Sequence, residues 1–169
     1  MSLLLASFSA FAFQGAGVVL PPEPDENGLV AQYGSGVCRV STFGKDKDGE
    51  RIRAEFSRRL RDGNLSVSLY GPFINAYRGK DINENHPVTV AFDTGASDPS
   101  RSGGYDTGGF REYVWGGWGP GAASDATYAK LEDASSFSVK MDGNTFGPFT
   151  WTGTGAVHNA LQICEEMNS

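Results

Sequence analysis

The sequence predicts a mainly β domain of the α+β class, an antiparallel β-sheet or sandwich built of hairpins. Between Gly36 and Phe92 apolar and polar residues alternate, which is the pattern of strands with one buried face. Asp-Gly-Asn sequences, which favour tight turns, separate alternating segments at 62–64 and 142–144. Helical spacing appears only late, and it predicts a short helix near 125–134 and a C-terminal helix over 155–167 that packs on the sheet.

The strands follow the alternation in chain order. They are expected over residues 37–43, 51–58, 65–70, 87–92, 137–141 and 145–151. The segment from Gly95 to Gly121 is expected to be irregular because it is rich in glycine. Ser124 is the predicted N-cap of the shorter helix, since it precedes an acidic first turn and good helix formers.

The start of the chain suggests export. Residues 1–20 form a signal-type segment: 2–20 carry no charge, and the apolar run 3–12 ends in Ala-Phe-Ala, which is similar to a cleavage site. A buried N-terminal strand or helix is the alternative, because no basic residue precedes the run. Residues 21–28 form a proline-rich linker, and 29–169 are expected to form one β-rich domain.

Composition narrows the classes of partner. The chain is 39% apolar with a net charge of -6, values typical of a globular protein. Its 20 acidic against 14 basic residues argue against nucleic acid and anionic lipid as partners, and the apolar run is too short for a membrane span. One basic cluster, over 51–61, is interpreted as the solvated face of a strand, with an anion-binding strip as the alternative.

The two cysteines, Cys38 and Cys164, are predicted to form a disulfide. Cys164 lies on the apolar stripe of the last helix and Cys38 on the first predicted strand, so the bond would tie that helix to that strand. Closing so long a loop would contribute about 5 kcal/mol in the chain-entropy model. Such a bond favours a periplasmic or secreted protein, and two buried free thiols are the alternative.

One motif suggests catalysis. Asp93-Thr94-Gly95 resembles the active-site loop of aspartic proteases, and a second triplet begins at Asp106. That chemistry needs two aspartates that share a proton. The triplets are too close in the chain to belong to two lobes, and residues 97–103 are polar where the retroviral-type enzymes continue as an apolar strand. A retropepsin-like protease is therefore only the alternative to a non-enzymatic domain, in which the Asp and Gly of the motif are turn residues after a strand.

No cofactor or metal site is expected. His86 and His158 have no identifiable nucleophile or metal-ligating partners, and 46–50 holds only a fragment of a calcium-loop pattern. The favoured function is binding of a partner protein, a glycan or an envelope component through an aromatic surface. The rings expected there are those of Tyr105, Tyr113, Trp115 and Trp118. Packing of this segment over the sheet is the alternative.

The order of features resembles a known family. An early cysteine, an alternating hairpin, the strand Pro-Val-Thr-Val-Ala-Phe-Asp and the ending Ala-Leu-Gln-Ile-Cys resemble the invasion-associated locus B family of exported α-proteobacterial proteins, over about residues 38–164. The resemblance implies a periplasmic or surface β-domain with a helix packed on it and no established catalytic residues. In some members it implies a role in host-cell interaction. This chain departs from the pattern in its two cysteines and its long glycine-rich insertion.

Overall fold

A computed structural model places the parts of the chain that are described below. They are residues 28–46, 48–71, 88–99, 101–103, 113–141 and 143–169. The signal-type segment, nearly all of the linker, and the residues His86, Tyr105 and Asp106 lie outside the described residues. The mainly β class with two helices is confirmed.

The larger sheet is antiparallel and has six strands in the order β1-β2-β3-β4-β8-β7. Its strands are β1 (Val30–Gly34), β2 (Val37–Lys45), β3 (Arg51–Arg59), β4 (Leu65–Tyr70), β8 (Val114–Gly119) and β7 (Arg101–Gly103). The β3–β4 hairpin turns at the predicted Asp-Gly-Asn sequence, where Arg59 N donates to Asn64 O at 3.0 Å. Apolar and polar residues alternate along β3 and β4, so the sheet has one core face and one outer face.

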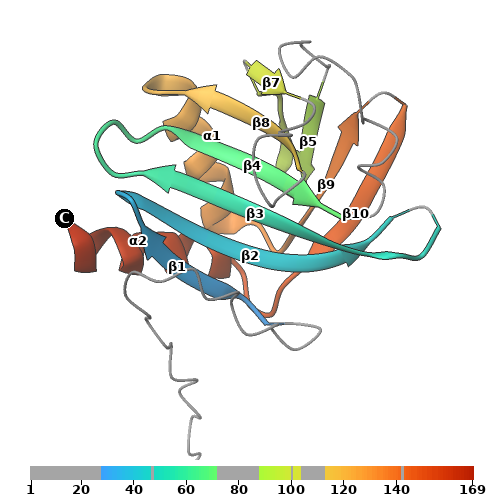
Figure 1. Cartoon of the computed structure of the whole chain (residues 1–169), viewed down its shortest axis with the longest axis horizontal. Helices are drawn as coiled ribbons and strands as arrows, with labels where there is room; N and C mark the ends of the chain where they lie inside the picture. Colours follow the sequence, from blue (N-terminus) through green and yellow to red (C-terminus); the bar gives the residue numbers. More distant parts are fainter. Residues whose placement is uncertain (1–27, 47, 72–87, 100, 104–112, 142) are drawn as a thin grey trace, which may run out of the picture.

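The smaller sheet has four antiparallel strands in the order β10-β9-β5-β6. Its strands are β10 (Asn144–Thr150), β9 (Ser136–Met141), β5 (Val88–Phe92) and β6 (Gly95–Ser97). Helix α1 (Ala122–Asp133) lies behind β4 and β8, and α2 (Ala156–Asn168) runs beside β1 and β2 (Figure 1). The helices and the smaller sheet therefore cover one face of the larger sheet, and none of the helices and strands described here covers its other face.

The core lies between the two sheets and under the helices, as one continuous cluster of apolar side chains. Phe137 of β9 is at its centre, with its ring centroid 5.0 Å from that of Phe56 and 4.7 Å from that of Phe149. Strands β2 and β10 meet where the sheets join, and Thr42 Oγ1 donates to Thr150 O at 3.2 Å. Aromatic rings from both sheets thus hold the two layers together.

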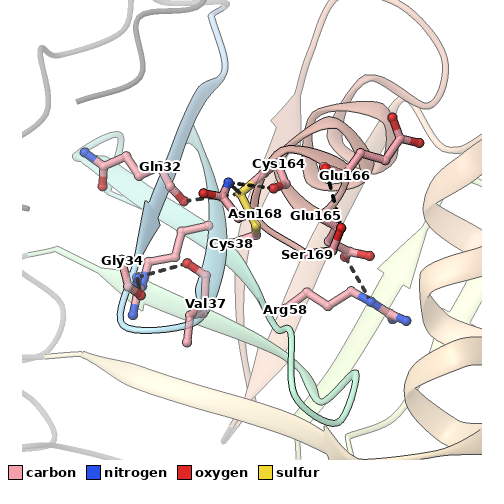
Figure 2. The surroundings of a disulfide bond; sticks show 11 residues. Gln32, Gly34, Val37, Cys38, Arg58, Cys164, Glu165, Glu166, Asn168 and Ser169 are labelled. Carbon is pink, nitrogen blue, oxygen red and sulfur yellow. Dashed lines mark hydrogen bonds and ion pairs between the residues drawn. A yellow bond between two sulfur atoms is a disulfide. The ribbon is translucent and has the colours of Figure 1, made fainter. Parts of the chain in front are cut away.

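The predicted disulfide is confirmed. Cys38 and Cys164 are both fully buried, their Cα atoms are 5.9 Å apart, and the bond closes a loop with a sequence separation of 126. Figure 2 shows the sulfur–sulfur bond between α2 and the sheet, with the ion pair of Arg58 Nε and Glu165 Oε1 (3.0 Å) nearby. The structure corrects one detail: β1 precedes Cys38, so the cysteine lies on the second described strand and not on the first.

Two other expectations were wrong. The segment from Gly95 to Gly121 contains three strands, β6, β7 and β8, although its glycines predict irregular structure. Ser124 is not the N-cap of α1: the helix begins at Ala122 after Gly121, and Ser124 lies buried in its first turn. Its hydroxyl accepts a hydrogen bond from Leu65 N at 2.8 Å and donates to Gly119 O, so it joins the helix to β4 and β8.

Candidate binding groove

The outer face of the larger sheet carries a groove of about 370 Å³ across β2, β3, β4 and β8. Its floor is polar and consists of Glu55, Ser57, Ser66 and Ser68. Its sides carry Arg39, Arg59, Asn64, Tyr70, Tyr113 and Trp115. A groove of this volume falls in the range of small-ligand sites in proteins.

Strand register explains why these residues meet. On β3 the odd-numbered residues face outward, while Ile52, Ala54 and Phe56 face the core. Ser57 pairs with Ser66 of β4, and Glu55 pairs with Ser68, which in turn pairs with Trp115 of β8. Because small serine side chains occupy the middle of these cross-strand rows, the sheet is hollow there.

On the aromatic side of the groove, the ring of Trp115 packs against Gly117. A Cβ atom added at Gly117 would lie 3.4 Å from Cζ3 of Trp115, so the indole ring lies across the strand at the position where other residues carry a side chain. The rings of Tyr70 and Tyr113 stand beside each other with centroids 5.4 Å apart. Three partly exposed rings therefore line one side of a polar floor.

Glu55 is the charged centre of the floor, and it is only 4% exposed. Ser41 Oγ donates to its Oε2 at 3.2 Å, and the Tyr70 hydroxyl donates to its Oε1 at 3.3 Å. Arg39 Nε and Arg53 Nη2 lie 3.8 and 3.9 Å from its oxygens. Burial raises the pKa of Tyr70 to about 12, and the negative charge of Glu55 adds to the shift, so this phenol stays protonated as a donor.

Arg59, at the other end of the groove, pairs closely with Asp62, which the exposed Arg61 Nε also approaches at 3.6 Å. The Nε and Nη2 of Arg59 each approach a different carboxylate oxygen of Asp62 at 2.8 Å. The hydrogen bond from Arg59 lowers the pKa of Asp62, against a smaller opposing effect of burial. Asp62 thus balances the charge of Arg59, whereas Arg39 and Arg53 share the single carboxylate of Glu55.

The predicted aromatic surface divides between the groove and the core. Trp115 and Tyr113 line the groove. Trp118 is 3% exposed, and its Nε1 donates to Ser97 Oγ at 3.0 Å, so the packing alternative holds for this ring. The reason is the period of a strand, which places residues 115 and 118 on opposite faces of β8.

Asp93 is hydrogen-bonded within a turn. It lies exposed directly after β5, where its carboxylate accepts hydrogen bonds from the Ser135 backbone N–H at 3.1 Å and from the Ser135 hydroxyl. Burial raises the pKa of Asp93, but the hydrogen bonds from Ser135 and Ser136 outweigh it and hold the pKa below its usual value. These contacts join the β5–β6 turn to the short connection between α1 and β9.

The basic cluster of β3 does not form one strip. Arg53 and Arg59 lie on the outer face, but Arg58 faces the helices. There Arg58 stacks over the ring of Tyr128 at 4.0 Å and pairs with Glu165 and Asp125.

Among the described residues no group of three or more His, Cys, Asp or Glu side chains could hold a metal ion. No described helix is long and apolar enough to cross a membrane.

Sequence reasoning missed the polar half of the groove. Glu55, Ser57 and Arg59 lie on the strand face that the alternation of β3 predicts to be wet, so this signal was present in the sequence. Tyr70 stands at the end of the predicted hairpin, and its place beside Tyr113 depends on the pairing of β4 with β8. That pairing joins segments far apart in the chain and has no local signal.

The fold and the groove define an antiparallel two-sheet β protein with a ligand-sized hollow on the outer face of its larger sheet. No protein-family model, curated protein or solved structure matches the chain. The resemblance to the invasion-associated locus B family therefore stays a prediction.

Proposed function

We propose that this chain is an exported, non-enzymatic binding domain that holds a glycan in the groove. The observation that carries the proposal is the row of rings, Tyr70, Tyr113 and Trp115, beside a floor of serine hydroxyls. Sugar rings have apolar C–H faces that pack on aromatic rings and hydroxyl edges that pair with polar side chains. A glycan fits this combination better than a protein, because protein interfaces usually bury a larger and drier centre.

The charged groups of the groove favour binding over catalysis. Glycoside hydrolysis uses a pair of carboxylates across the scissile bond. Among the described residues that line the groove, Glu55 is the one carboxylate, and it is already engaged by Ser41 and Tyr70. The disulfide fits an oxidising compartment, which supports a periplasmic or secreted location.

Replacing Trp115 with alanine is expected to weaken glycan binding about tenfold or more, because the ring supplies the stacking surface. The change should affect stability little, since the ring is partly exposed. The wild-type protein is first screened on an array of neutral and acidic glycans. Calorimetric titration of the best ligand then measures its affinity for the wild type and for Trp115→Ala.

Tyr33→Ala is the matched control. Tyr33 is 37% exposed, and it pairs with Cys38, which places it on the face of the sheet opposite the groove. We expect this variant to bind as the wild type does. The proposal fails if no glycan on the array binds, or if Trp115→Ala binds as tightly as Tyr33→Ala.

A further inference from the structure

The charges around the groove do not cancel. Arg39 and Arg53 both approach Glu55, but at 3.8 and 3.9 Å, which is longer than the 2.7–2.9 Å of strong charge-assisted hydrogen bonds. Arg59 is balanced by Asp62 at 2.8 Å. Among the described residues around the groove, two guanidinium groups therefore share one carboxylate, which leaves about one unit of positive charge there within a chain whose net charge is -6.

Arg39 is the group that can present this charge to a ligand. Its side chain is 31% exposed and lines the groove, whereas that of Arg53 is 18% exposed and stacks over Tyr70 at 4.1 Å. The Arg39 Nη1 donates to Gly34 O at 3.1 Å, which holds the guanidinium in place. Its Nη2 makes no hydrogen bond to any residue that the structure describes.

The position of Arg39 relative to Trp115 sets the size of the ligand. One row across the sheet runs from Arg39 through Ser57 and Ser66 to Gly117, over which the Trp115 ring lies. β2 and β8 are three strand spacings apart, or about 14 Å. A ligand that touches both side chains must cross the strands and span more than one sugar unit.

We infer that the groove selects an acidic oligosaccharide whose carboxylate pairs with Arg39 while another sugar ring of the same ligand stacks on Trp115. The inference rests on the proposed function and specifies its ligand as a uronic-acid glycan. A planar carboxylate suits a guanidinium because both groups can align their hydrogen bonds in one plane. Glu55 acts as the counter-charge that keeps Arg39 oriented and limits the attraction.

Calorimetric titrations with matched sugars test the inference. The probes are tetrasaccharides of galacturonate, mannuronate, guluronate and the glucuronate–N-acetylglucosamine repeat, each beside its carboxyl-reduced form, in which every carboxylate has become a primary alcohol. We expect at least one acidic probe to bind about tenfold more tightly than its reduced form.

Variants of the charged groups give opposite effects. Arg39→Gln should abolish the preference for the acidic form over the reduced form, whereas the near-isosteric Glu55→Gln should increase this preference. Arg51→Gln is the matched control, because Arg51 is an arginine at the start of β3, the strand of Glu55, but stacks over Phe43 outside the groove lining. Thermal melts show whether each variant is folded. Arg39→Lys keeps the positive charge and should keep the preference for the acidic form, so it tests the role of Arg39 if Arg39→Gln does not fold.

Each outcome separates the two proposals. If a reduced probe binds as tightly as its acidic form, the inferred selectivity is wrong while glycan binding stands. The assignment to Arg39 is overturned if Arg39→Gln keeps the preference or Arg39→Lys loses it while folded. If neither form of any probe binds, the inference is overturned, and the glycan array then decides the proposed function by itself.

Discussion

Phe137→Ala is expected to destabilise the protein by about 3–5 kcal/mol, the usual loss for a buried phenylalanine. Phe137 is 2% exposed, and its ring meets rings from both sheets: Phe56 of the larger sheet, and Phe92 and Phe149 of the smaller one. Trp151, which follows β10, lies 5.9 Å away. Alanine would leave a cavity at the point where the two layers meet.

Urea unfolding followed by circular dichroism measures this loss. Tyr33→Ala, at an exposed position on β1, should change the free energy of unfolding by no more than about 0.5 kcal/mol. A loss below about 1 kcal/mol in Phe137→Ala would mean that this ring does not join the sheets as described.

The double variant Cys38→Ala/Cys164→Ala is expected to lose about 3–5 kcal/mol of stability. The bond spans a separation of 126 residues, and cross-linking a loop of that length greatly reduces the entropy of the unfolded chain. It also fixes α2 to β2, so the helix should unfold more readily when the bond is absent. Alanine is used because both positions are fully buried and a serine hydroxyl would lack a partner.

Reductant provides the matched comparison for this prediction. Wild-type protein unfolded in urea with reductant should show a similar loss, while the double variant should be insensitive to reductant. A thiol assay on the purified, denatured wild-type protein should find no free cysteine. Two reactive thiols in that assay would show that the pair is not formed in the native protein.

The sequence predicts the hairpins, the disulfide and both helices because each has a local signal. Strand β8 has none, since Val-Trp-Gly-Gly-Trp-Gly has the composition of a loop. Its glycines are required by tertiary contacts. A Cβ atom at Gly116 would lie 2.7 Å from Pro99 Cγ, and Gly117 accommodates the Trp115 ring. Such contacts form only after the chain has folded, so no local pattern reveals them.

The candidate site shows the same division. Its aromatic residues stand out in the sequence because tryptophan and tyrosine cluster there, and Trp115 and Tyr113 do line the groove. The prediction that Trp118 belongs to the same surface assumed that this segment is irregular. The segment is a strand instead, and the Trp118 ring lies in the core. Glu55 comes from β3 and meets Tyr70 and Trp115 only through cross-strand pairing.

The three tryptophans allow the most direct test of the groove. Trp118 and Trp151 are 3% and 6% exposed, and their indole N–H groups donate to Ser97 and to Ala134 within the protein. Trp115 alone lines the groove. A nitrogen-15 NMR spectrum resolves one indole signal for each tryptophan, and substitution of each assigns it. Titration with the acidic tetrasaccharides should shift the Trp115 signal and leave those of Trp118 and Trp151 in place, whereas an unmoved Trp115 signal at saturating ligand would contradict binding in the groove.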